Sequence, residues 1–299
     1  MIIIGGSVAA TTAGVYAARR GLDFKIITKE FGGEVATSGT IENWPGIATI
    51  DGLALADQFK SHLAANHVVP EEGVEVVSIV KNVDGSFSVE AGEQKFEAKS
   101  LIVTTGVHPR ELGIPGEKEF RNKGVTYCTT CDGPLFQDKI TTVVGGGNSA
   151  LESALMLAEI ASKVYLINKN NQFKGEQVLI DKVTSHKNIQ VVYGAKTAEI
   201  KGEQLVSEIV YTDSSGTSQA LKTDGIFIHI GMIPNSGIVP KDVLKDGFGQ
   251  IMVDDHCATN VAGLFAAGDV TNVPFKQIVI AAGQGCIAAL SVVEYLNRK

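Results

Sequence analysis

The sequence predicts an α/β fold with two Rossmann-like domains, each a three-layer arrangement of a parallel sheet between helices. Two glycine-rich turns, at Gly5 and at Gly145, each lie between a short apolar run and a stretch of small residues at helical spacing. A second apolar run follows each turn at the same distance, ending at Thr28 in one case and at Asn168 in the other. This repeat indicates two equivalent βαβ units.

Length and composition fit that organisation and exclude several classes of protein. The chain has 299 residues, which suggests two domains at roughly 150 residues each. Hydrophobic residues make up 44% and charged residues 20%, the balance of a folded chain rather than a disordered one. The net charge of -7 argues against a basic nucleic-acid-binding surface. No secretory signal is expected at the N-terminus, and a cytoplasmic protein is predicted.

The first βαβ unit is expected at the N-terminus, with strands at 2–4 and 24–27. Between them, Ala9, Ala13 and Ala17 share one helix face, where small side chains let helix and strand approach closely. Strands within 74–90 and 95–105 are expected to close this domain. A crossover is predicted at 108–110.

The second unit repeats the pattern, with strands expected at 141–144 and 164–167. Further strands are predicted at 189–192, 208–211 and 225–230.

Residues 251–299 contain no βαβ unit and are expected to return to the first domain. That domain is then discontinuous, comprising 1–109 and 239–299, and the second comprises 110–238. The apolar stretch 278–296 is interrupted by glycines and polar residues, so it is interpreted as a buried helix rather than a membrane span.

The glycine-rich turns are candidate dinucleotide sites, because such a turn exposes N–H groups at a helix N-terminus that can hold a pyrophosphate. The second turn matches G-x-G-x-x-A in full, whereas Ser7 replaces the middle glycine of the first. Serine is small and can donate a hydrogen bond. The alternative is that each glycine-rich turn is only a tight connection between a strand and a helix and binds no nucleotide. The candidate residues are Gly5, Gly6, Ser7, Ala9 and Ala10 in the first turn, and Gly145, Gly147, Asn148, Ser149 and Ala150 in the second.

Residues 168–174 predict which nicotinamide nucleotide the second site prefers. Asn168 stands where an acidic residue usually holds the adenine ribose, and it could bond the ribose hydroxyls. The stretch has no arginine to grip a 2'-phosphate and no carboxylate to repel one. Lys169 and Lys174 could bind a phosphate weakly. NADH is therefore predicted, with NADPH as the alternative.

Cys128 and Cys131 form a C-x-x-C motif just before the second turn. Two cysteines at this spacing can close a disulfide and take part in thiol exchange. Inert thiols are one alternative. A zinc site is the other, but it would need about four ligands, so no metal is predicted. The other two cysteines, Cys257 and Cys286, are expected to be buried as small apolar residues.

Asp132, next to Cys131, is the nearest group able to supply or remove a proton. It is therefore a candidate acid–base residue. The alternative is a turn residue, because Asp-Gly-Pro at 132–134 has typical turn chemistry.

Together these motifs make the chain resemble the low-molecular-weight thioredoxin reductases over nearly its whole length. In the redox motif, Thr129 replaces the family's usual alanine. The segments that carry the resemblance are 2–21 (FAD loop and helix), 42–46 (flavin motif), 104–106 (crossover), 128–132 (redox centre), 145–150 (pyridine nucleotide loop), 263–269 (second FAD motif) and 276–278.

The resemblance implies an FAD enzyme in which a nicotinamide nucleotide reduces the flavin, the flavin reduces Cys128–Cys131, and the dithiol reduces a protein disulfide. It assigns the flavin-proximal thiol to Cys131, the attacking thiol to Cys128 and acid–base chemistry to Asp132. It also implies a homodimer and a rotation of the nicotinamide domain about 109–113 and 236–240. The implied FAD-binding residues are Asn43, Thr105, Gly106, Gly268, Asp269, Lys276, Gln277 and Ile278.

From Lys174 onward the chain also resembles the flavoprotein component of alkyl hydroperoxide reductase, which uses NADH. That protein has an additional N-terminal dithiol domain, so the acceptor here is expected to be a separate protein. Thioredoxin-like, glutaredoxin-like and peroxiredoxin-linked carriers are the candidates. Two other functions remain open. One is a flavin diaphorase or NADH oxidase with idle cysteines, and the other is a non-enzymatic nucleotide-sensing or scaffold protein.

Overall fold

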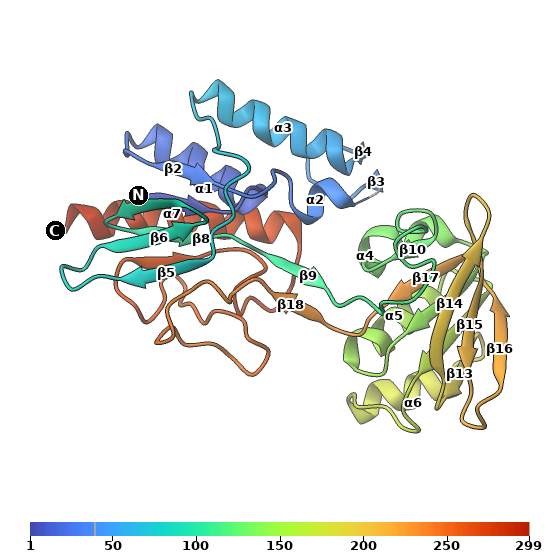
Figure 1. The fold of residues 1–299 in the computed structure, drawn as a ribbon. Helices are drawn as coiled ribbons and strands as arrows, with labels where there is room; N and C mark the ends of the chain where they lie inside the picture. The colour runs from blue at the N-terminus through green and yellow to red at the C-terminus, as the bar shows by residue number, and fades with distance from the viewer. Residues whose placement is uncertain (39, 299) are drawn as a thin grey trace. The chain divides into compact units, whose positions relative to one another are not determined.

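The computed structural model describes residues 1–38 and 40–298, and the chain forms two compact units (Figure 1). Unit 1 comprises Met1–His108 and Ile233–Lys299, and unit 2 comprises Pro109–Met232. The first border lies next to the predicted one, and the second lies a few residues earlier. Asn235 explains the earlier border, because its backbone N–H donates to Gly106 and its side-chain amide donates to the carbonyl oxygen of Thr105.

Unit 1 is built on a four-stranded parallel sheet in the order β19-β8-β1-β2. The helix α1 (Val8–Arg19) connects the first two strands, as the first βαβ pattern predicts. The C-terminal segment returns to this unit, because β19 pairs with β8 and helix α7 packs on α1. The strands are β1 (Ile2–Ile4), β2 (Lys25–Ile27), β8 (Leu101–Val103) and β19 (Leu264–Ala266).

A three-stranded antiparallel sheet, β5-β6-β7, lies between β2 and β8 in sequence. The expected strand at 74–90 is interrupted by a turn, in which the Gly85 N–H donates to Asn82 and Gly85 has φ 86°. The remaining elements of unit 1 are α2 (Glu34–Thr37), β3 (Thr40–Ile41), β4 (Ile50–Asp51), α3 (Gly52–Ala65), β5 (Ser78–Lys81), β6 (Phe87–Ala91) and β7 (Gln94–Ala98).

Helix α7 (Ile278–Asn297) is long and apolar enough, by length and composition, to cross a membrane. Within unit 1 it packs along α1 (Figure 1), but only 28% of its most apolar stretch is buried, so it is a partly buried helix rather than the buried helix expected. A Cβ on Gly285 would strike the backbone oxygen of Ala9, so glycine is needed for this close approach. Core helices of globular domains pass the same test of length and composition.

Unit 2 has a five-stranded parallel sheet in the order β10-β17-β11-β12-β13. Helix α5 connects β11 to β12, which completes the second βαβ unit and confirms the predicted fold class. Its strands and helices are β10 (Val125–Thr126), α4 (Thr129–Asp132), the 3-10 helix η1 (Gly133–Phe136), β11 (Ile140–Val144), α5 (Asn148–Ala158), β12 (Lys163–Asn168), α6 (Gln177–Ser185), β13 (Ile189–Tyr193) and β17 (Gly225–Ile228).

A second, antiparallel sheet in unit 2 consists of β14 (Lys196–Gly202), β15 (Val206–Thr212) and β16 (Ser218–Lys222). The sequence predicts only the central strand of these three. Strand β16 is mostly exposed and polar, so it lacks the apolar pattern that would have indicated a strand. Strands β9 (Val107–Pro109) and β18 (Met232–Pro234) pair where the chain crosses between the units, at the predicted crossover.

Candidate functional site

The first glycine turn leaves backbone N–H groups available at the start of α1. Gly5 has φ 128°, and a Cβ there would strike the backbone oxygen of Thr104, so the turn requires glycine. Ser7 is the N-cap of α1, yet its side chain makes no capping hydrogen bond to the helix. Uncapped N–H groups beside the carboxyl end of a parallel strand fit a pyrophosphate.

Ser7 uses its side chain for a contact that glycine could not make. Its hydroxyl donates to the carbonyl oxygen of Gly32 at 2.6 Å, and the Gly32 N–H donates to Gly6 at 2.7 Å. The serine therefore ties the first turn to the glycine pair at 32–33. This hydrogen bond gives Ser7, which stands where the motif has its middle glycine, a structural role at the predicted site.

Asp269 presents a buried carboxylate oxygen in unit 1. Among the residues that the structure describes, none donates a hydrogen bond to Oδ1 of this side chain. Burial raises the pKa of Asp269 to about 6, against the lowering effect of the nearby Lys276 ammonium. A buried acceptor of this kind needs a donor. The ribityl hydroxyls of a flavin nucleotide would supply one, so the residues present fit FAD.

Gln284 supports the turn that carries Asp269. Its side-chain oxygen accepts the N–H of Gly268 at 2.8 Å and lies 3.2 Å from the Thr271 hydroxyl. Gly268 has φ 79°, a conformation that favours glycine. Gln284 is not among the predicted site residues, although a glutamine inside an apolar helix is a visible signal.

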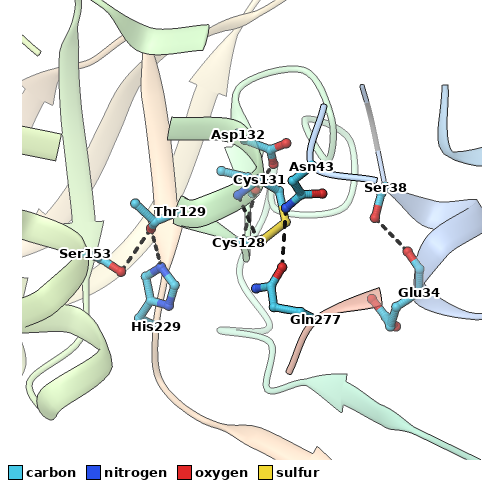
Figure 2. Close-up of a disulfide and its surroundings, with 11 residues drawn as sticks. Glu34, Ser38, Asn43, Cys128, Thr129, Cys131, Asp132, Ser153, His229 and Gln277 are labelled. Carbon is cyan, nitrogen blue, oxygen red and sulfur yellow. Dashed lines mark hydrogen bonds between the residues drawn. A yellow bond between two sulfur atoms is a disulfide. The ribbon is translucent and has the colours of Figure 1, made fainter. Parts of the chain in front are cut away.

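Several other predicted flavin-binding residues are connected to one another within unit 1. The Asn43 amide donates to the Gln277 side-chain oxygen at 3.3 Å, which Figure 2 shows. Gln277 is the N-cap of α7, so Ile278 begins that helix. The Lys276 ammonium donates to the carbonyl oxygen of Thr271 at 2.6 Å.

Thr105 and Gly106, which were predicted from the crossover motif, hold the returning chain. The Thr105 hydroxyl donates to the carbonyl oxygen of Asn235 at 2.8 Å. Gly106 has φ 65° and accepts the backbone N–H of the same asparagine. Their positions in unit 1 are thus fixed by backbone contacts.

The second glycine turn has the same construction at the start of α5. A Cβ on Gly145 would strike the backbone oxygen of His229, and a Cβ on Gly147 would meet no described atom within 4 Å. Asn148 begins the helix, and its amide exchanges two hydrogen bonds with Glu176, at 3.0 and 2.8 Å. The open side of Gly147 leaves room for a ligand at the helix N-terminus.

Asn168 shapes the loop that follows β12. Its side-chain oxygen accepts the N–H of Asn170 and its amide donates to the carbonyl oxygen of Gln172, both at 3.0 Å. The residue is only 1% exposed, so contact with a ribose would require replacing these bonds. Lys169 and Lys174 are exposed on the same loop. Their proposed phosphate contacts stay predictions.

Cys128 and Cys131 form the expected disulfide in unit 2, with their Cα atoms 5.3 Å apart (Figure 2). Cys128 is the N-cap of the short helix α4, and its Sγ accepts the Cys131 N–H at 3.2 Å. Both residues are partly exposed. The pairing therefore supports redox chemistry at this turn and argues against two inert thiols.

Asp132 is held by Thr126, which is not among the predicted site residues. The Thr126 hydroxyl donates to Oδ2 of Asp132 and accepts the Cys128 N–H at 3.2 Å. Burial raises the pKa of Asp132, and the hydrogen bond from Thr126 partly offsets that rise. The carboxyl group is thus tied to the redox turn and holds a proton more readily than an ordinary aspartate.

The two remaining cysteines differ from each other. Cys257 is buried as expected, and burial raises the pKa of its thiol to about 12. Cys286 is only partly buried and lies beside the Tyr16 side chain, which corrects the expectation for that position. Within residues 1–38 and 40–298, no group of three or more His, Cys, Asp and Glu side chains is placed to hold a metal.

Comparison with protein families and solved structures places these features among known proteins. The model of the family described as "Pyridine nucleotide-disulphide oxidoreductase" matches residues 1–285. Thioredoxin reductase from Streptococcus pyogenes has a TM-score of 0.94 and 34% identity, covering 100% of this chain and 98% of that one. This match confirms the resemblance predicted from the motifs.

Curated relatives match the chain along its whole length. The F component of alkyl hydroperoxide reductase from Escherichia coli is 39% identical, over 100% of this chain and 58% of the relative. A protein named NADH dehydrogenase from Bacillus subtilis is 37% identical, again over 100% of this chain and 58% of the relative. The chain therefore spans a little over half the length of these proteins.

Proposed function

Since this chain belongs to the pyridine nucleotide-disulphide oxidoreductase family, we propose that it is an FAD-dependent reductase of protein disulfides that takes its electrons from a nicotinamide dinucleotide. The observation that carries the proposal is the Cys128–Cys131 disulfide, which lies in the same unit as the glycine turn before α5. FAD, when bound, would supply two-electron transfer between the nicotinamide and the sulfur pair.

The chain's own residues support each step at sulfur. Two electrons and two protons convert the disulfide into a dithiol, after which Cys128 attacks a disulfide of the partner protein and forms a mixed disulfide. Cys131 then attacks Cys128, which releases the reduced partner and restores the internal disulfide. The Cys131 N–H would stabilise a thiolate on Cys128, and Asp132 would exchange the protons.

The flavin would be held by residues of unit 1. The uncapped start of α1 would bind its pyrophosphate, and Asp269 would accept a hydrogen bond from a ribityl hydroxyl. Asn43 and Gln277 are joined to each other, and they would position the start of α7 towards the flavin ring.

FAD affinity is expected to increase as the pH rises through about 6, the pKa of Asp269 without flavin. A hydroxyl that donates to the carboxylate favours its ionised form, so below that pH affinity should fall by up to about tenfold per pH unit. Fluorescence titration of flavin-free protein with FAD, from about pH 5 to about pH 8, measures this dependence. The Asp269→Asn variant should bind FAD more weakly, and its FAD affinity should not change with pH over this range. An unchanged slope in that variant would contradict the assignment.

NADH is expected to reduce the bound flavin faster than NADPH by about tenfold, the effect of one missing charge-assisted hydrogen bond. The loop at 168–174 contains no arginine, and its exposed lysines offer single charges rather than a bidentate fork. Stopped-flow absorbance at equal, subsaturating nucleotide concentrations measures the two rates. Replacing Lys169 and Lys174 by arginine should raise the NADPH rate selectively. Faster reduction by NADPH in the unsubstituted chain would overturn this preference.

The partner is proposed to be a thioredoxin-like protein, with glutaredoxin-like and peroxiredoxin-linked carriers as alternatives. The solved relative named thioredoxin reductase supports the first, and the alkyl hydroperoxide reductase relative supports the last. A homodimer, a cytoplasmic location and a domain rotation about 109–113 and 236–240 stay predictions from the resemblance.

A second candidate function is oxidation of NADH without use of the cysteines, as in a diaphorase or NADH oxidase. The relative named NADH dehydrogenase favours this alternative. The two functions differ in whether electrons must pass through Cys128, so substitution of that residue separates them.

A further inference from the structure

Thr129 brings a buried hydroxyl into the redox turn, at the position where the resembling family usually has alanine. The residue is 4% exposed and is the first residue of α4, directly after Cys128. Its hydroxyl donates to the Ser153 hydroxyl at 2.9 Å, and its Oγ1 lies 2.7 Å from Nε2 of His229, as Figure 2 shows. A buried hydroxyl without such partners would be costly.

These contacts connect the redox turn to two other elements of unit 2. Ser153 is a buried residue in the middle of α5, the helix that begins at the second glycine turn. His229 follows β17 directly, and its backbone N–H donates to the carbonyl oxygen of Val144 at 2.8 Å. Ser153 is therefore fixed within a helix and His229 by its backbone hydrogen bond to the end of β11, whereas α4 has only four residues.

The direction of the hydrogen bonds follows from the number of available protons. With the hydroxyl proton of Thr129 donated to Ser153, Oγ1 accepts a hydrogen bond from Nε2 of His229 in the Nε2–H tautomer. Desolvation lowers the pKa of His229 to about 4. The ring is therefore neutral under physiological conditions and acts on the turn as a hydrogen-bond donor rather than as a charge.

The turn that is held in this way contains the contact on which thiol reactivity depends. The N–H of Cys131 donates to Sγ of Cys128 at 3.2 Å, and such a donor stabilises a thiolate more than it stabilises a disulfide. We propose that His229 is a positioning residue of the redox centre, which acts through the hydroxyl of Thr129 to keep the Cys131 N–H directed at the Cys128 sulfur. The proposal rests on the disulfide-reductase function proposed above.

The expected consequence is a shift in the equilibrium between the disulfide and the dithiol. Reduction adds two electrons and two protons to Cys128–Cys131, and part of the product ionises to the Cys128 thiolate. If the turn loosens, that thiolate loses its donor. The disulfide then becomes harder to reduce, and the Cys128 thiol becomes a slower nucleophile.

The test compares Thr129→Ala, Thr129→Ser, His229→Leu and the double variant Thr129→Ala/His229→Leu as purified flavoproteins. The dithiol fraction is measured in dithiothreitol redox buffers at fixed pH, and the alkylation rate of Cys128 by iodoacetamide is followed by peptide mass spectrometry. Thr129→Ala and His229→Leu should each lower the reduction equilibrium constant and the alkylation rate by about two- to tenfold. Thr129→Ser should stay within about twofold of the original chain, because it keeps the hydroxyl.

The double variant decides whether His229 acts through Thr129. It should match Thr129→Ala alone, because the imidazole then has no hydroxyl to position. Additive effects, or an equilibrium that Thr129→Ala leaves unchanged, would overturn the proposal. If His229→Leu does not fold, His229→Gln can replace it, because its amide N–H can donate to Oγ1 and should preserve both readouts. A His229→Gln variant that behaves like Thr129→Ala would also count against the proposal.

Failure of this inference is distinguishable from failure of the proposed function. Neither measurement uses a nicotinamide nucleotide or a partner protein, so both report on the sulfur pair alone. Thermal unfolding and flavin content of each variant show whether the effect is confined to the redox turn.

Discussion

Cys128→Ser is expected to abolish reduction of a thioredoxin-like disulfide, with turnover falling on the order of 10³-fold or more. Serine cannot form the internal disulfide with Cys131 or the mixed disulfide with the partner, so no route remains from the flavin to the acceptor. Reduction of the flavin by NADH should persist, because the predicted nucleotide sites lie outside the redox turn. The measurement is NADH consumption with and without the acceptor protein.

Cys286→Ser is the matched control, because Cys286 is partly exposed and lies on α7, outside the redox turn. It should retain the activity of the unsubstituted chain. Survival of acceptor turnover in Cys128→Ser would eliminate the disulfide-reductase function. NADH consumption with oxygen or quinones that is equal in both variants, with no turnover of any disulfide, would favour the diaphorase instead.

Cys131→Ser adds an independent test of the order of attack. Cys128 would still attack the partner disulfide, but no second thiol could resolve the product. A stable mixed disulfide between Cys128 and the partner should therefore accumulate and be visible by mass spectrometry under non-reducing conditions. A linkage that forms only in Cys128→Ser, through Cys131, would reverse the assigned roles.

Asp132→Asn is expected to lower turnover by about 10²-fold or more, the usual effect of removing a general acid–base group. Burial raises the pKa of Asp132, so its protonated form persists to higher pH than that of an ordinary aspartate. Proton donation by this carboxyl should decrease as the pH rises through the raised pKa. Turnover measured across pH should show that decrease in the original chain and a flat profile over the same range in Asp132→Asn.

Thr126→Val provides the matched comparison for Asp132. The Thr126 hydroxyl donates to the carboxylate and lowers its pKa, so removing the hydroxyl should move the decrease in turnover to higher pH. The raised pKa also predicts how Asp132 affects the free energy of unfolding. Because the pKa is higher in the folded state, ionisation of Asp132 destabilises the fold, and Asp132→Asn should not lower the stability at neutral pH. Identical pH profiles in all three proteins would exclude Asp132 as the acid–base group.

Local sequence was sufficient for the features whose parts lie close together along the chain. Cys128 and Cys131 are three residues apart, so a single helical turn brings the two sulfurs together. The two glycine turns were predictable for the same reason, because strand, turn and helix follow one another directly. Asp132 was selected through its neighbour, although its partner Thr126 was not, because a threonine in a short buried strand gives no pattern that marks it.

Contacts between residues that are distant in the sequence could be identified only in the folded structure. Asn43 and Gln277 are 234 residues apart, and their hydrogen bond exists because the C-terminal segment returns to the first sheet. His229 and Thr129 are 100 residues apart, and β17 places one beside the other. Asn168 also depends on the folded chain, because its side-chain amide makes hydrogen bonds within its own loop, and its proposed contact with a ribose stays a prediction.

The amino-acid sequence by itself determined the two-unit α/β organisation, the redox cysteine pair and the membership of a flavoprotein family, because periodicity, glycine turns and short motifs are encoded over a few neighbouring residues. Only the tertiary structure decided which polar groups are buried and what they meet. Burial controls both the cost of an unpaired oxygen at Asp269 and the neutral state of His229, and it depends on segments that no local pattern connects.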